Sequence, residues 1–164
     1  MKIEIMNKSK KQDFLKELSY LGEFKMQQLF LKTGQESVRI YSGHLLSDEI
    51  LKIWRHFPVE GLGLYFGKQI IDRHGVKEAR LSLDALHTIR KDITDSIVEI
   101  NHEQVEKWFR GNNVELTPEQ KNNYSRFVGK FVAVKFGEDF VGTARLSADG
   151  ILISFLPKER RIRN

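Results

Sequence analysis

Two groups of basic residues, far apart in the chain, have the types and spacing needed to hold a phosphate backbone. In the first group, Lys107 and Arg110 lie three residues apart, so both would face the same side of a helix. Gly111 follows, where a backbone without a side chain lets a phosphate approach. Asn112 and Asn113 carry amides that can bond base edges or sugar hydroxyls. This order predicts a helix end that contacts nucleic acid.

The second basic group lies at the end of the sequence and consists of Lys158, Arg160, Arg161 and Arg163. Guanidinium groups bind phosphate through paired hydrogen bonds and stack on bases. The chain has 27 Lys and Arg against 22 Asp and Glu, and the net charge of +5 favours a polyanionic partner. We expect the side-chain heads of Arg160 and Arg161 to reach solvent and RNA. The alternative at this point is an ordinary solvated basic surface.

The sequence contains no recognisable catalytic motif. It has no cysteine, which excludes disulfides, cysteine-ligated metals and thiolate nucleophiles. Residues 102–106 begin like a zinc-protease helix, with His102 and Glu103, but lack the second histidine four residues later. No serine lies in a nucleophile elbow. The sequence therefore predicts no metal, no cofactor and no enzymatic activity.

Three glycines lie within the strand-like segment 61–67. Their spacing does not match the G-x-G-x-x-G fingerprint of dinucleotide-binding proteins, and the segment does not lead into a helix. We interpret them as glycines that let a strand bend or let neighbouring backbone approach closely.

Membrane and export signals are missing from the sequence. No stretch approaches about 18 consecutive apolar residues, the length that a spanning helix needs. The N-terminal segment has no apolar run of signal-peptide length. We expect a cytoplasmic protein without membrane contact.

The hydrophobic pattern divides the chain into two parts, which we predict as domains 1–94 and 95–164. In the first part, alternation predicts strands and helical spacing predicts helices, in the order β-α-β-β-α-β-β-α. The predicted strands are 3–5, 26–31, 38–41, 62–71 and a partner that ends at 81. Ser9, Ser47 and Ser82 are the predicted helix caps, and Gly22 and Pro58 are the predicted ends of the first two helices. This order predicts an α+β unit.

The second part is predicted to be mostly β. Strand 96–100 precedes a helix that is capped by Asn101, turns Val105, Trp108 and Phe109 inward, and ends at Gly111. A short strand 114–116 leads to a helical turn that Thr117 caps. Strands 130–136, 140–146 and 151–156 follow. Three tightly linked antiparallel strands predict a small, partly open barrel.

The second part resembles the PUA domain, the small RNA-binding pseudobarrel of pseudouridine synthases and archaeosine transglycosylases. The resemblance covers 97–162 and rests on strand 97–100, the helix through Trp108 and Phe109, Gly111, and segments 128–134 and 140–144. The ending 150–161 resembles the C-terminal region of the Nop/Sun (Fmu) type RNA cytosine-5 methyltransferases. Segment 62–86 resembles the region before PUA in those proteins. The resemblance implies an α/β sandwich-like pre-PUA module followed by a PUA-type β pseudobarrel.

The methyltransferases that this chain resembles use cysteines to attack cytosine, and this chain has none. The resemblance therefore implies a non-catalytic RNA-binding protein, an accessory factor in ribosome biogenesis or in rRNA or tRNA modification. Its implied partners are structured rRNA or tRNA, with a separate RNA-modifying enzyme or a ribosomal precursor. In the PUA family the RNA face resembles the surface made by the last strand and by the glycine loop. This loop connects the helix to the following strand and contains Gly111 here. Carried over, these residues are Arg110, Gly111, Asn112, Lys158, Arg160 and Arg161.

Two other hypotheses stay open. One is a subunit that docks a separate RNA-modifying enzyme, with only minor RNA contact. Exposed aromatic residues in the first domain would favour it, and the candidates are Tyr20, Trp54, Tyr65 and Phe66. Core packing is the other use of such residues. The last hypothesis is an enzyme with an unrecognised site.

Overall fold

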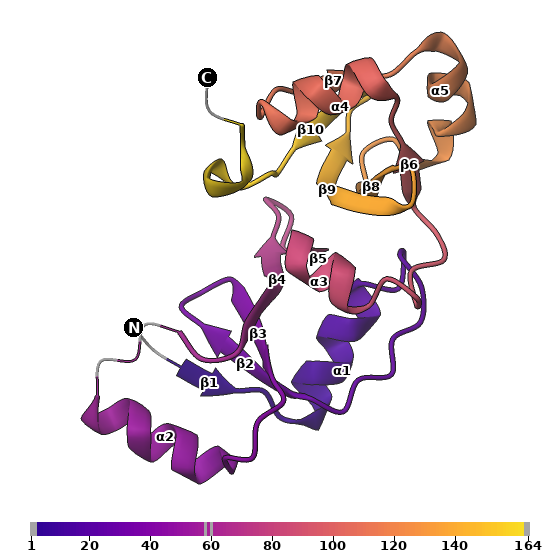
Figure 1. Cartoon of the computed structure of the whole chain (residues 1–164). Helices are drawn as coiled ribbons and strands as arrows, with labels where there is room; N and C mark the ends of the chain where they lie inside the picture. The colour runs from indigo at the N-terminus through magenta and orange to yellow at the C-terminus, as the bar shows by residue number, and fades with distance from the viewer. Residues whose placement is uncertain (1–2, 58, 60, 163–164) are drawn as a thin grey trace. The chain divides into compact units, whose positions relative to one another are not determined.

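The computed structural model describes residues 3–57, 59 and 61–162 (Figure 1). The backbone forms two compact units, each with a five-stranded sheet. Unit 1 comprises the described residues up to Ser19 and from Glu23 to Ala85, and unit 2 comprises Tyr20–Gly22 and the described residues from Leu86 on. Both units combine helices with a sheet, which confirms the predicted α+β class. The predicted boundary between residues 94 and 95 stays a prediction.

Unit 1 is built on an antiparallel sheet in the order β1-β2-β3-β4-β5. Its strands are β1 (Ile3–Ile5), β2 (Leu29–Thr33), β3 (Ser37–Tyr41), β4 (Leu64–Ile71) and β5 (Lys77–Leu81). Its helices are α1 (Lys8–Glu17) and α2 (Ser47–His56), and α3 (Leu83–Thr88) crosses the division between the units. The order of elements is the predicted one.

Three phenylalanines form the centre of the unit 1 core. Phe14 of α1 lies 6.0 Å from Phe30 of β2 and 6.4 Å from Phe66 of β4, measured between ring centroids. The rings of Phe30 and Phe66 are 5.6 Å apart in an edge-to-face arrangement, which suits their quadrupoles. All three side chains are buried. Phe66 therefore packs the core and is not an exposed docking residue.

Two predicted helix starts are wrong by one or two residues. Asn7 caps α1 instead of Ser9, because its Oδ1 accepts a hydrogen bond from the Lys10 amide at 2.9 Å. Ser47 is the first residue of α2 and not its cap. The predicted cap Ser82 is confirmed, since its Oγ accepts from the Ala85 amide at 3.1 Å. Asparagine and serine both suit this position, so the local sequence alone does not choose between Asn7 and Ser9.

The predicted helix ends also differ from the structure. α1 ends at Glu17, well before Gly22. α2 ends at His56, and the predicted stop at Pro58 lies outside the described residues.

Close backbone approach explains two glycines of segment 61–67. A Cβ on Gly67 would lie 2.2 Å from the carbonyl oxygen of Arg80 on β5. A Cβ on Gly63 would lie 2.1 Å from the carbonyl oxygen of Ile40, and Gly63 has a φ of +72°. Both positions need glycine because any side chain would meet backbone atoms. The interpretation of this segment as structural is confirmed.

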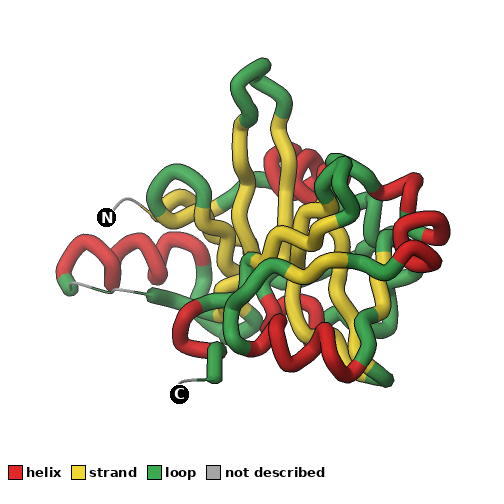
Figure 2. The backbone as a smooth tube through the Cα atoms, turned by 90° about the horizontal axis from the view of Figure 1, so that it is seen from above, coloured by secondary structure: helices red, strands yellow, loops and turns green. Residues whose placement is uncertain are grey.

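Unit 2 has a sheet in the order β6-β8-β9-β10-β7, in which only the β6–β8 pair is parallel. Its strands are β6 (Ile97–Glu99), β7 (Val114–Glu115), β8 (Phe131–Phe136), β9 (Asp139–Leu146) and β10 (Ile151–Ser154). Its helices are α4 (His102–Phe109), α5 (Pro118–Asn123), η1 (Ser125–Phe127) and η2 (Lys158–Arg160). The curled sheet forms the predicted partly open barrel. Figure 2 draws the strands of both units in yellow.

No helix in the described part of the chain is both long enough and apolar enough to cross a membrane.

Candidate nucleic-acid interface

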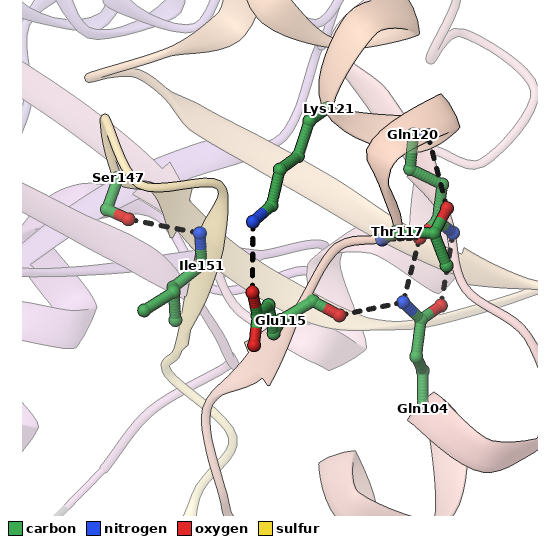
Figure 3. Close-up of polar contacts among 7 residues, drawn as sticks. All are labelled: Gln104, Glu115, Thr117, Gln120, Lys121, Ser147 and Ile151. Atoms are coloured by element: carbon green, nitrogen blue, oxygen red, sulfur yellow. Dashed lines mark hydrogen bonds and ion pairs between the residues drawn. The ribbon is translucent and has the colours of Figure 1, made fainter.

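α4, the helix that carries the first basic group, is held at its start by a reciprocal cap. Asn101 Oδ1 accepts from the Gln104 amide, and Gln104 Oε1 accepts from the Asn101 amide, both at 2.9 Å. Thr117 and Gln120 cap α5 in the same way. The two glutamines also bond to each other, with Gln104 Nε2 2.8 Å from Gln120 Oε1 (Figure 3). The caps predicted at Asn101 and Thr117 therefore also join α4 to α5.

The same junction contains an ion pair on the surface. Lys121 Nζ of α5 lies 2.9 Å from Glu115 Oε1 of β7 (Figure 3). The hydrogen bond from Lys121, together with its charge, lowers the pKa of the Glu115 carboxyl below its ordinary value. Protonation of Glu115 in acid would therefore remove this contact between α5 and β7.

Trp108 fixes α4 on the sheet. Its side chain is fully buried, and its Nε1 donates to the carbonyl oxygen of Val141 on β9 at 2.8 Å. A Cβ on Gly142 would lie 2.7 Å from Trp108 Cζ2, so the ring packs directly on the strand backbone. Val105 and Phe109, which were also predicted to face inward, are half-buried. Trp108 thus sets the position of the helix end that follows it.

The end of α4 is a Schellman motif centred on Gly111. The Gly111 amide donates to the carbonyl oxygen of Trp108 at 2.9 Å, and the Asn112 amide donates to that of Lys107 at 3.1 Å. Gly111 has a φ of +80°, a left-handed conformation that strongly favours glycine. The predicted helix end at Gly111 is confirmed. The motif turns the chain sharply into the loop that carries Asn112 and Asn113.

The C-terminal segment folds back onto this helix end. The Ile162 amide donates to the carbonyl oxygen of Phe109 at 2.8 Å. Arg161 lies over Gly111, where a Cβ would be 2.4 Å from the Arg161 Cδ. The Arg161 guanidinium also donates from Nε and Nη2 to the carbonyl oxygen of Leu156, at 3.2 and 3.0 Å. Two segments fifty residues apart in sequence therefore meet in one place.

Asn113 links the glycine loop to the last strand. Its Oδ1 accepts from the Ser154 amide at 3.1 Å, just beyond the pairing of β7 with β10. The sequence predicts only an RNA contact for Asn113, and no pattern in it indicates this hydrogen bond to the last strand.

The remaining predicted residues surround this contact. Lys107, Arg110, Asn112, Lys158 and Arg160 are exposed, and we call these five residues the basic patch. Arg110 forms an ion pair with Glu106 one turn earlier at 3.1 Å. Arg163 lies outside the described residues.

Arg161 is held more closely by the protein than the sequence suggests, and its contact with RNA stays a prediction. Its side chain is half-buried because the guanidinium bonds a main-chain carbonyl and the stem covers Gly111. Arg161 therefore positions the C-terminal segment against the glycine loop.

Unit 2 can be compared with known domains by three features. They are its strand order, the buried tryptophan of α4, and the contact between the glycine loop and the C-terminal segment. Residues 95–162 match the family model of the methyltransferase RsmF PUA domain. This match confirms that the C-terminal part of the chain is a PUA domain resembling the C-terminal region of the Sun/Fmu methyltransferases. No curated protein gives a significant match. A PUA domain from a family of RNA methyltransferases points to RNA as the partner.

The described residues contain no cluster of side chains that could hold a metal ion. Among residues 3–57, 59 and 61–162, no three His, Asp or Glu side chains lie together as a metal site would need. The ring of His102, from the zinc-protease-like segment, instead lies 4.9 Å from that of Phe136.

Replacing Gly111 with valine is expected to lower both stability and RNA affinity. A β-branched residue in the left-handed region costs roughly 1–2 kcal/mol, and its Cβ would also displace Arg161. Gly137, in the β8–β9 turn, offers a matched control because it also has positive φ but has open space at its Cβ position. Gly137→Val should therefore lower the melting temperature but leave the RNA affinity of the folded protein unchanged. Equal affinity loss in both variants would contradict the role of Gly111 in RNA contact.

Proposed function

We propose that this protein is a non-catalytic RNA-binding protein that acts as an accessory factor in ribosome biogenesis or in rRNA or tRNA modification. The observation that supports the proposal is the contact between the glycine loop and the C-terminal segment of a PUA domain, because these two segments and the end of α4 carry the basic patch. Exposed cations beside the tight turn that ends α4 suit a phosphate chain. The amides of Asn112 and Asn113 add groups that can bond bases or sugars.

Structured rRNA or tRNA is the proposed partner, and a separate RNA-modifying enzyme would supply the chemistry. The chain contains no cysteine with which to attack cytosine as the Sun/Fmu enzymes do. The proposal therefore gives the PUA domain the task of holding RNA for another catalyst. Crosslinking in cells, followed by sequencing of the attached RNA, tests it. A defined set of ribosomal or transfer RNA sites supports the proposal, whereas a random, low-yield profile contradicts it.

RNA binding by the basic patch should depend steeply on salt. About four phosphate contacts give a log–log slope near −3 for single-stranded or loop RNA, because each contact releases condensed counterions. Titrations of a fluorescent stem–loop RNA at several potassium chloride concentrations measure this slope. Retained affinity with a slope near zero would contradict phosphate contact as the source of affinity.

A second candidate function, docking of a separate protein, is favoured by one observation. Ile53 lies on α2, Phe57 follows its last residue and Leu46 precedes its first; these side chains are 39%, 64% and 66% exposed. Exposed apolar residues on one helix are typical of interaction surfaces. Of the aromatic candidates from the sequence, Trp54 also lies on α2 and is half-buried. Loss of a co-purifying partner after Phe57→Ser, with RNA affinity unchanged, would support docking.

A further inference from the structure

A second exposed surface of unit 2 combines cations with apolar side chains. It lies where η1 and the loop after it meet β9, which pairs with β8 and β10, and we call it the stacking surface. Its residues are Arg126, Val128, Lys130, Arg145 and Ile153. Cross-strand pairing places Arg145 of β9 between Phe131 of β8 and Ile153 of β10. The surface thus assembles from three separate segments of the chain.

The loop that carries Val128 is held rigidly against β9. The Gly129 amide donates to the carbonyl oxygen of Leu146 at 2.7 Å, and the Leu146 amide donates to that of Lys130 at 3.1 Å. The Lys130 amide closes the turn on the carbonyl oxygen of Phe127 at 3.0 Å. Apart from Gly129 and its two neighbours in the chain, no described heavy atom lies within 4 Å of the Cβ position of Gly129. A ligand can therefore approach a backbone that is already ordered.

Two guanidinium groups of this surface lie on buried aromatic rings. The Cζ atom of Arg145 lies 4.2 Å from the centroid of the Phe131 ring, and its Nη1 donates to the carbonyl oxygen of Gly129 at 3.2 Å. The Cζ of Arg126 lies 4.5 Å from the centroid of the Phe127 ring, while the Arg126 side chain is 70% exposed. A planar cation held in one orientation loses little conformational entropy when a base stacks on it.

Apolar side chains lie beside these cations. Val128 is 42% exposed and Ile153 is 39% exposed. The faces of unpaired bases are apolar enough to pack on such side chains, while their phosphates pair with cations. A base-paired duplex hides those faces. The combination favours single-stranded nucleotides over duplex.

We propose that the stacking surface binds unpaired nucleotides of the RNA whose phosphates contact the basic patch. The inference rests on the proposed function and adds to it a preference for RNA with unpaired bases. β10 connects the two surfaces: its Ile153 belongs to the stacking surface, and the amide of Ser154 bonds Asn113 in the glycine loop. One RNA strand can therefore reach both.

Two double variants separate the contributions of charge and of stacking. Because the two cations of the stacking surface add about two phosphate contacts to the four of the basic patch, the salt slope on a stem–loop RNA should steepen from about −3, the value for the basic patch alone, to about −4. Arg126→Gln with Lys130→Gln should weaken binding of this RNA roughly ten-fold and return the slope to about −3. Val128→Ser with Ile153→Ser should weaken binding several-fold and leave the slope unchanged, because no cation is lost. Both should reduce the preference for the stem–loop over a blunt duplex with the same number of nucleotides.

The matched control removes two exposed cations from α2 of unit 1. The double change Lys52→Gln and Arg55→Gln alters the net charge by the same amount as the double change at Arg126 and Lys130. The change at Lys52 also removes an exposed ion pair, as the change at Arg126 does. We expect this control to bind RNA like the parent. An equal loss of affinity in the control would overturn the inference, because net charge alone would then explain the effect.

Photocrosslinking gives a readout that does not depend on affinity. Benzoylphenylalanine in place of Ile153 should crosslink to the stem–loop RNA under ultraviolet light, whereas the same group in place of Leu46 should not. One result would overturn this inference and leave the proposed function standing. In that result the parent binds RNA, the stacking-surface variants bind RNA equally well, and the probe in place of Ile153 gives no adduct. Adducts with protein alone in a cell extract would also overturn it. If the parent binds no RNA, the proposed function fails first.

Discussion

Removing three cations from the basic patch should weaken RNA binding roughly hundred-fold. Lys107→Gln, Arg110→Gln and Lys158→Gln each remove one charge-assisted phosphate contact, worth on the order of 1 kcal/mol. Three such contacts amount to about two powers of ten in the dissociation constant. The salt slope should become less steep by about 2. Fluorescence titration of the stem–loop RNA at two or more salt concentrations measures both quantities.

The same triple variant should keep its stability. All three side chains are exposed, so the free energy of unfolding should change by less than about 0.5 kcal/mol per site. A triple change of Lys25, Lys52 and Arg55 to glutamine is the matched control, because it removes three exposed cations from unit 1. If the patch variant and this control bind RNA equally well, the basic patch is not the RNA site.

Trp108→Ala should have the largest effect on stability. The side chain is fully buried between α4 and β9, and truncating a buried aromatic residue costs about 3–5 kcal/mol. That is a large part of the 5–15 kcal/mol, roughly, that stabilises a typical domain. We therefore expect unit 2 to unfold at much lower temperature or denaturant concentration. RNA binding should be lost with it, because Trp108 positions the helix end at Gly111.

Two further variants identify the cause of this effect. Trp108→Phe keeps most of the apolar volume but leaves the carbonyl oxygen of Val141 without its donor, which should cost about 1–3 kcal/mol. Trp54→Ala makes the same truncation at a half-buried site on α2 and should cost less than Trp108→Ala. Circular dichroism during thermal unfolding measures all three. Equal melting temperatures for the two alanine variants would show that Trp108 does not anchor α4.

Local sequence determined most of the secondary structure. The caps at Ser82, Asn101 and Thr117 and the helix end at Gly111 depend on groups within a few residues of one another, and all four were predicted correctly. Hydrophobic periodicity likewise gave the order of strands and helices in both units. Where two residues could cap the same helix, as at Asn7 and Ser9, local chemistry did not discriminate between them.

The tertiary structure decided how the basic residues are used. Arg161 and Arg160 are neighbours of the same type, yet one side chain lies over Gly111 and the other is exposed. No local pattern groups Arg126 and Lys130 with Arg145, because Arg145 is distant in the chain and reaches their loop only when β8 pairs with β9. Charge and composition favoured a polyanionic partner but did not indicate where it would bind. The location depends on strand pairing between distant residues, and a local pattern in the sequence does not encode such long-range contacts.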